Sequence, residues 1–352
     1  MNYSKILDIS DLSRNELMET LRLLGSIKDN TNMFTGECTG KTLVFVFDNE
    51  NRNKQSSYAA AMARLGGFAL PFKLKDNENL KDSVLTACSR GDIIAISHHL
   101  KGAALAASLY STLPIINAGD LSFDLPCDTL RDVATIWYTQ NHVSNMKIGF
   151  CGDVYSKGEV KALVKVLSIY NGNSFAFCDA KNAEISSELM SLISESGKEY
   201  EHFHSLDEMI EDVDVLYMTP VSKENFTDDK DYKTALDRCT LDARLLLSAK
   251  ATLSILHPFP RSEELPVFVD FDDRAKYFEQ LEYDVLSIMT FIYRMFRNRA
   301  GRIAKPDEVK STHGFYCGHK ECITSTEDYL PALFFESGDN LVCSYCKNNV
   351  ET

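Results

Sequence analysis

The chain has 352 residues, a formal net charge of −14 and an apolar fraction of 44%. This length accommodates two domains with full cores, and the composition is that of a globular protein. The acidic balance argues against a nucleic-acid partner, for which a basic stripe is expected. No apolar run reaches membrane-spanning length and the first ten residues lack a signal-peptide core, so we expect a cytoplasmic protein without a membrane partner.

Strand and helix patterns alternate along most of the chain. A capping box, Ser13-Arg-Asn-Glu16, opens a helix with leucines on one face. Strands are predicted at 43–47, 68–72, 92–96, 113–117, 147–151, 174–178, 213–218 and 254–257, and helices at 79–89, 102–110, 129–139, 185–196 and 277–298. This alternation predicts an α/β protein with two doubly wound parallel-sheet domains. A break near residues 140–146 separates the two domains.

The stretch from Leu43 to Gly67 is the one around which the first domain is organised. A Val- and Phe-rich strand leads through a polar loop into an Ala-rich helix, which Ser56 or Ser57 is expected to cap. A helix N-terminus after a strand is a favoured place for an anion, because free N–H groups and the helix dipole point there. The alternative is an ordinary strand–helix junction without a ligand.

The ten cysteines fall into two groups. Six are scattered singly among apolar neighbours and are expected to be reduced core residues. The other four form C-x4-C and C-x2-C pairs twenty residues apart: Cys317, Cys322, Cys343 and Cys346. Two close thiolate pairs are typical of a structural zinc site in a small ribbon, whose metal-binding free energy is on the order of 10–16 kcal/mol. The alternatives are four free cysteines, or His319 as a substitute ligand.

Several segments, in order along nearly the whole chain, resemble aspartate carbamoyltransferase. They are ARLGG (63–67), SHHLKGAA (97–104), INAGD (116–120), DVLYMTPVSKENF (214–226) and LHPFPRSEEL (256–265). The resemblance implies a carbamoyl-phosphate domain at residues 1–140, onto which helix 277–298 returns, and an aspartate domain at 141–276. It also implies a trimer with active sites between chains and a place in pyrimidine biosynthesis.

The C-terminal segment resembles the zinc domain of the regulatory chain of the same family. The similarity lies in Cys322-Ile-Thr-Ser-Thr-Glu327 and in the closing Cys-Ser-Tyr-Cys. In that family the zinc domain docks on catalytic chains, so residues 315–352 are expected to form such a domain. Residues 299–314 form a linker too short for the nucleotide-binding domain of the regulatory chain. The familiar nucleotide regulation is therefore not implied.

The family's anion-binding motifs are altered in this chain. The Ser-Thr-Arg-Thr-Arg loop corresponds to Glu50–Gln55, with the register open by one residue, so Arg52, Asn53 and Lys54 are the candidates there. The family's Arg-His-Pro corresponds to Ser97-His98-His99 in this chain, and its His-Pro-x-Gln corresponds to Leu125-Pro-Cys-Asp128. The arginine that binds aspartate in the family corresponds to Gly158, and Thr-Arg-Val-Gln corresponds to Thr219-Pro-Val-Ser222. The mobile loop is shortened around residues 74–79. Only His257-Pro258-Phe259-Pro260-Arg261 stays close to its pattern.

These changes disfavour carbamoyl phosphate and aspartate, which together bring roughly four negative charges. Each charge-assisted hydrogen bond contributes roughly 1.5–3 kcal/mol, so the loss of three arginines costs about 5–9 kcal/mol. Glu50, Asp124 and Asp128 add negative charge. The residues left at catalytic positions are Arg52, Lys54, His98, Asp128, His257 and Arg261, and the ligand-binding candidates are Arg52, Asn53, Ser97, His98, Pro258 and Phe259. Alternatively, basic residues elsewhere replace the lost ones, from Lys54, Lys73, Lys75, His98, Lys157 and Arg261.

Three functions are therefore open. The first is a catalytically impaired paralogue that acts by assembly, as a homotrimer or together with an active carbamoyltransferase chain. The second is an active carbamoyltransferase with a less anionic amino substrate. The third is a small-ligand sensor that uses the cleft between the domains.

Overall fold

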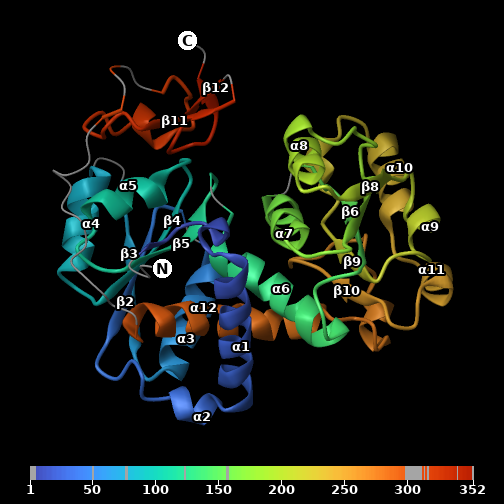
Figure 1. The fold of residues 1–352 in the computed structure, drawn as a ribbon, viewed down its shortest axis with the longest axis horizontal. Helices are drawn as coiled ribbons and strands as arrows, with labels where there is room; N and C mark the ends of the chain where they lie inside the picture. Colours follow the sequence, from blue (N-terminus) through green and yellow to red (C-terminus); the bar gives the residue numbers. More distant parts are fainter. Residues whose placement is uncertain are drawn as a thin grey trace. The chain divides into compact units, whose positions relative to one another are not determined.

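The computed structural model describes residues 5–49, 51–75, 78–122, 124–155, 158–297, 311–312, 314, 317–338 and 340–350. The chain divides into two compact units (Figure 1). Unit 1 comprises Met1–Cys127 and Asp284–Thr352, and unit 2 comprises Asp128–Tyr283. Among the described helices, none combines the length and the apolar character needed to cross a membrane.

Unit 1 contains a five-stranded parallel sheet. Its spatial order is β1 (Lys5–Ile6), β5 (Ile115–Asp120), β4 (Ile93–His98), β2 (Thr42–Phe47) and β3 (Phe68–Lys73). Val44 and Val46 face α4 and α5, and because side chains alternate along a strand, Phe45 faces the other side and packs against Tyr58 of α3. The helical elements are η1 (Ile9–Asp11), α1 (Arg14–Asp29), α2 (Thr31–Phe34), α3 (Arg52–Arg64), α4 (Leu80–Cys88), α5 (Ala103–Tyr110) and the C-terminal part of α12 (Tyr277–Arg297).

Unit 2 contains a second five-stranded parallel sheet. Its order is β10 (Ser254–Leu256), β9 (Val215–Met218), β6 (Lys147–Gly152), β7 (Ser174–Asp179) and β8 (Glu199–His202). The helical elements are α6 (Pro126–Gln140, which begins in unit 1), α7 (Gly158–Ser168), α8 (Ser187–Glu195), α9 (Leu206–Met209), η2 (Lys223–Asn225), α10 (Asp229–Cys239), α11 (Ala243–Ser248) and η3 (Val267–Phe271). At the end of β6, Gly152 has a φ of +114°, and a Cβ there would lie 2.1 Å from the Thr219 carbonyl oxygen. Only glycine allows this close approach.

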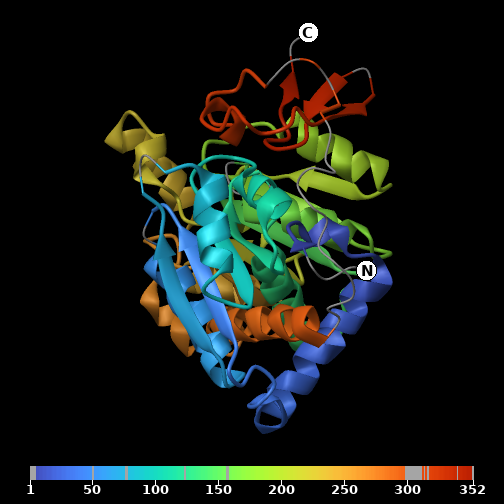
Figure 2. The ribbon, with the colours of Figure 1, turned by 90° about the vertical axis from the view of Figure 1, so that its left-hand side faces the viewer.

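The C-terminal segment forms a small antiparallel sheet within unit 1. Its strands are β11 (Phe334–Ser337), β12 (Asn340–Cys343) and β13 (Asn349–Val350), preceded by η5 (Ile323–Ser325). We call residues 317–350 the ribbon. Apolar side chains of the ribbon and of α4 and α5 form one continuous core, so the ribbon packs on this helix pair (Figure 1 and Figure 2).

The predicted fold class is confirmed, and strands or helices occur at the places predicted for them. The capping box of α1 is confirmed as well, since Ser13 and Glu16 each cap the other's backbone. One local prediction is wrong: α3 is capped by neither Ser56 nor Ser57. Asn51 accepts a hydrogen bond from the Lys54 amide at 3.1 Å, so the helix starts at Arg52. The polar residues 52–55 consequently form the first helical turn instead of a loop.

Candidate functional site

The carboxyl ends of β2 and β4 form the candidate site of unit 1. From β2 the chain continues to β3 on one side of the sheet, whereas β4, β5 and β1 lie on the other side, so the strand order reverses between β2 and β4. Ligands of open α/β sheets bind at such a switch point. Phe47 and Ser97 are register partners, and the residues that follow them, Asp48 on one strand and His98 on the other, therefore meet at this edge.

Asp48, His98 and His99 form a connected cluster there. The Asp48 carboxylate accepts hydrogen bonds from the His99 amide at 3.0 Å and from the His99 ring, and it lies 3.6 Å from His98 Nδ1. The two imidazole rings stack with centroids 4.9 Å apart. His98 Nδ1 also accepts a hydrogen bond from the Leu100 amide at 3.0 Å. The lone pair of that nitrogen is thus already used within the loop.

The electrostatics of the cluster are unfavourable for an anionic ligand. Burial lowers the pKa of His98, so its ring is neutral at neutral pH. Burial would raise the pKa of Asp48, but hydrogen bonds from the amide and the ring of His99 outweigh it and hold that pKa below its usual value. The switch point therefore carries a carboxylate beside a neutral histidine.

The remaining candidates of unit 1 lie nearby along the chain. Arg52 and Asn53 are exposed in the first turn of α3, and Lys54 is half-buried. Lys73 and Lys75 are exposed at and after the end of β3. Glu50, like Lys157 of unit 2, lies outside the described residues, as does part of the shortened loop at 74–79.

In unit 2, the segment 257–261 after β10 is held by internal pairs. His257 and Glu264 are buried, and His257 Nε2 lies 3.0 Å from the Glu264 carboxylate. Arg261 makes a bidentate pair with Asp270 and stacks over Phe259, while Pro258 is half-buried. The guanidinium that the resemblance offered as an anion ligand is therefore neutralised within its own unit.

The other arginines of unit 2 are also held within that unit, three of them by carboxylates and Arg238 by a carbonyl group. Each donates to, or forms an ion pair with, a carboxylate or a carbonyl group of that unit. The pairs are Arg131 with Asp132 and Asp128, Arg238 with the Ala180 carbonyl, Arg244 with Asp207, Arg261 with Asp270, and Arg274 with Asp272. Asp128, predicted at a catalytic position, is thus a buried partner of Arg131.

The other positions that the resemblance matches to anion-binding motifs carry no cationic side chain either. Leu125 directly precedes α6, and Gly158 is the first residue of α7. In the segment that replaces Thr-Arg-Val-Gln, Ser222 donates its amide to Asp153 at 2.8 Å. Asp153 thereby organises the 219–225 turn in place of a ligand.

Comparisons with known proteins are consistent with this architecture. The aspartate/ornithine carbamoyltransferase carbamoyl-P binding domain matches residues 4–138, and the Asp/Orn binding domain matches residues 144–295. The chain belongs to the aspartate/ornithine carbamoyltransferase family. It is 36% identical over 296 residues to the aspartate carbamoyltransferase catalytic subunit of Clostridium novyi, which covers 82% of this chain and 97% of that one. The corresponding subunit of Finegoldia magna is 33% identical with the same coverage.

Solved structures of carbamoyltransferases show the same fold. The catalytic subunit of M. jannaschii aspartate transcarbamoylase superimposes with a TM-score of 0.81 at 29% identity, covering 86% of this chain and all of that one. Aspartate transcarbamoylase from Trypanosoma cruzi, in complex with N-(phosphonacetyl)-L-aspartic acid, gives a TM-score of 0.75 at 26% identity, covering 83% and 95%. The chain is thus aspartate carbamoyltransferase-like, and the ribbon lies beyond both matched domains.

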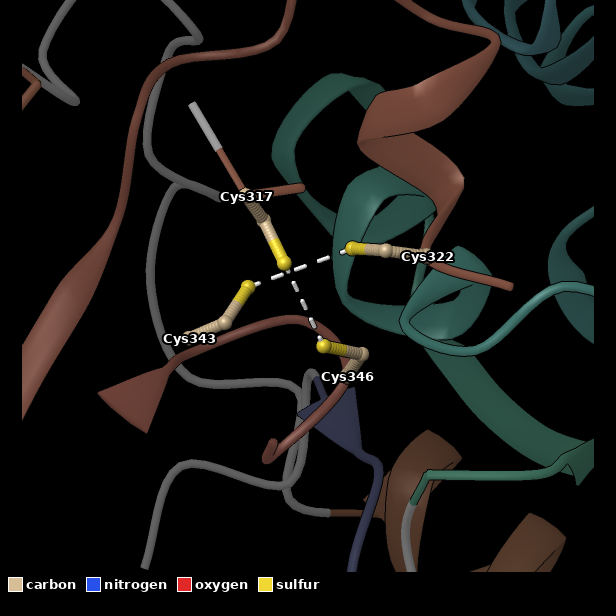
Figure 3. A group of neighbouring side chains, drawn as sticks. All are labelled: Cys317, Cys322, Cys343 and Cys346. Carbon is tan, nitrogen blue, oxygen red and sulfur yellow. Dashed lines mark hydrogen bonds between the residues drawn. The ribbon is translucent and has the colours of Figure 1, made fainter. Parts of the chain in front are cut away.

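The ribbon brings its four predicted cysteines together. All four are buried, and their sulfurs lie within 4.8 Å of one another, pointing inward from two turns (Figure 3). The Sγ–Sγ distances are 3.7 Å for Cys317–Cys346 and 3.9 Å for Cys322–Cys343. Thiolates at 2.3 Å from a tetrahedral zinc ion lie about 3.8 Å apart, so the group fits a metal ion of this kind. His319 instead contacts the Asn349 carbonyl at 2.8 Å and does not join the sulfurs.

The ribbon contacts the carbamoyltransferase-like part of unit 1 through its backbone. The Lys101 amide donates to the Glu321 carbonyl at 2.8 Å, and the Ile323 amide donates to the Lys101 carbonyl at 2.9 Å. Lys101 and Cys322 thereby form a parallel β-bridge. Cys322, one of the four clustered cysteines, is consequently adjacent to the loop that follows the His98–His99 pair.

Two ribbon side chains also complete the N-terminus of α4. Glu327 accepts a hydrogen bond from the Leu80 amide, and the Tyr329 hydroxyl accepts one from the Lys81 amide, each at 2.9 Å. Asn79 caps the next amide, that of Asp82. Free amides at a helix start need such acceptors. The roles of Glu327, Tyr329 and Asp48 were not predicted from the sequence, because no local pattern marks a residue whose partner lies far away in the chain.

Proposed function

We propose that this chain is a pseudoenzyme of the carbamoyltransferase family that acts through assembly and regulation instead of through transfer of a carbamoyl group. The observation that carries the proposal is the Asp48–His98–His99 cluster at the switch point of the first sheet. An anion approaching that edge meets a carboxylate and a neutral ring where arginines are required. The paired arginines of unit 2 support the same conclusion.

The proposal includes a structural zinc ion bound by Cys317, Cys322, Cys343 and Cys346. The four sulfurs leave no position for a substrate, so the metal would stabilise the ribbon and its contact with α4 and α5. When bound, the ion cross-links the two turns of the ribbon.

The proposed assembly is a trimer, formed by this chain alone or with an active carbamoyltransferase chain. The relatives from Clostridium novyi and M. jannaschii are catalytic subunits, which supports an oligomer. Strand β3, at the edge of its sheet, leaves Phe68 68% exposed, and Leu70 is also partly exposed. Exposed apolar side chains on a sheet edge are a common feature of contact surfaces.

The test combines ligand binding with turnover on the purified full chain. We expect neither carbamoyl phosphate nor aspartate to raise the melting temperature or to give a calorimetric signal, and we expect no carbamoyl aspartate to form. Ser97→Arg is the matched gain-of-function control, because it returns one guanidinium to the switch point. One charge-assisted contact of roughly 1.5–3 kcal/mol corresponds to an increase in phosphate affinity of about 10- to 150-fold.

Carbamoyl aspartate formed by the wild type would overturn the proposal outright. A carbamoyl product formed only with a neutral or cationic amine would favour an altered transferase, and tight binding of carbamoyl phosphate without any product would favour a sensor. Light scattering of the isolated chain, and co-purification with an active carbamoyltransferase chain, test the assembly. A monomer that binds no such chain would contradict it.

A further inference from the structure

Three buried cysteines of unit 2, which are scattered singly along the sequence, come together in the fold. Cys151 lies on β6, Cys178 on β7, and Cys239 is the last residue of α10. All three are free thiols and are fully buried, and their sulfurs lie within 4.8 Å of one another. The prediction of reduced core cysteines is confirmed for these three, and the fold in addition brings their sulfurs together.

The fold itself creates the group. Cys151 and Cys178 are direct register partners on neighbouring parallel strands, so their side chains project from the same face of the sheet. That face packs against α9, α10 and α11, and the end of α10 places Cys239 over the pair. The Cys151 thiol also contacts the Cys239 carbonyl oxygen at 3.7 Å. Within the described residues, no histidine or carboxylate joins the three sulfurs.

A positive charge lies directly beside the group. Arg238 precedes Cys239, and its guanidinium donates to the Ala180 carbonyl at 2.6 Å. In the described structure its Nε is buried and has no hydrogen-bond partner. A half-buried cation next to three thiols offsets part of the charge that deprotonated sulfurs would carry.

We propose that Cys151, Cys178 and Cys239 form a second metal site, a three-thiolate site for a soft, thiophilic ion such as Cu(I). Three thiolates at about 2.3 Å from one ion lie roughly 4 Å apart in a plane, so small side-chain movements close the site. Zinc prefers four ligands, whereas soft thiolates select Cu(I) and the sulfurs are shielded from water. Binding releases the thiol protons to solvent.

The experiment is an anaerobic titration of the reduced full-length chain with Cu(I), in competition with a chromogenic Cu(I) chelator. The variants are Cys151→Ala, Cys178→Ala and Cys239→Ala. Cys38→Ala is the matched control, since Cys38 is equally buried but belongs to no sulfur group of the described residues. We expect the wild type and the control to bind one Cu(I) more per chain than each of the three variants. The lost site should weaken at least 100-fold, because even changes outside the ligand shell cost 10- to 100-fold.

A second measurement on the wild type keeps the proposal testable if a variant does not fold. X-ray absorption at the copper edge should show a component with three sulfur neighbours, alongside any copper held by the four ribbon cysteines. Equal copper counts in the wild type and in the three variants would overturn the proposal. Copper that disappears entirely in Cys346→Ala would overturn it as well, because the ribbon would then be the only site.

Discussion

Gly102→Ala should detach the ribbon from α4 and α5. Gly102 has a φ of +87°, and a Cβ at this position would lie 2.4 Å from Tyr345 Cβ and 2.7–2.8 Å from the Tyr345 backbone. Left-handed backbone costs a non-glycine residue roughly 1–2 kcal/mol. Overpacking against backbone that cannot rotate away costs about 1–3 kcal/mol more. Only the overpacking acts on docking, because the backbone strain is present with or without the ribbon; about 1–3 kcal/mol lowers the docking equilibrium constant by about 5- to 150-fold.

Hydrogen exchange followed by mass spectrometry measures this docking through the exchange rates of amides at the contact. The amides of Leu80, Lys81 and Ile323 donate across the contact, so their exchange should accelerate in Gly102→Ala. Gly40→Ala is the matched control, because Gly40 has a φ of +73° and no atom within 4 Å of its added Cβ. It carries the backbone strain without the clash. Equal protection of the three amides in Gly102→Ala and Gly40→Ala would refute the steric argument.

Three further predictions concern the same architecture. Glu327→Ala leaves the Leu80 amide without its acceptor, so docking of the ribbon should weaken by about 1–3 kcal/mol. Hydrogen exchange should accelerate at the Leu80 amide, and less at the Lys81 amide, which donates to Tyr329. Removal of the bound metal by a strong chelator should open the ribbon, expose the apolar face of α4 and α5 to a dye such as ANS, and lower the melting temperature; an unchanged melting temperature would contradict a structural metal. Burial raises the pKa of Glu264, but hydrogen bonds from His257 and the Ser262 amide outweigh it and leave that pKa below its usual 4.5. The stability that Glu264 contributes is therefore present above pH 4.5 and is lost as the pH falls through its lower pKa in the folded state. Glu264→Gln should reduce this loss of stability at acid pH in unfolding titrations, and an identical pH profile of the variant and the wild type would contradict the prediction.

Features that depend on residues close together in the sequence could be predicted from it. The strand β2 and the four ribbon cysteines were predicted, because an apolar run and a C-x4-C…C-x2-C spacing are short-range patterns. The cap of α3 was predicted at the wrong residue, since Asn51, Ser56 and Ser57 all cap well and only the helix start at Arg52 distinguishes them.

Features that depend on sheet register could not be predicted from the sequence. Asp48 meets His98 because Phe47 pairs with Ser97, and no pattern within either segment reports that pairing. The same limitation applies to Cys151 and Cys178, which become neighbours only when β6 and β7 align. Long-range pairs of this kind require the three-dimensional fold, whereas capping and metal-ligand spacing do not.

The contact between the ribbon and its own unit limits the surfaces through which this chain can bind other chains. The proposed resemblance of the C-terminal segment to a regulatory-chain zinc domain implies docking on a catalytic chain. Here the equivalent segment uses Glu327, Tyr329 and the Lys101–Cys322 bridge on its own unit. A docking face that is occupied within the chain is not available to a second chain, so a partner must bind elsewhere. The exposed Phe68 and Leu70 of β3 offer a surface of that kind. Substituting both by Ser should therefore weaken a trimer while leaving the protection of the Leu80 amide unchanged, and loss of that protection would show that the two surfaces are not independent.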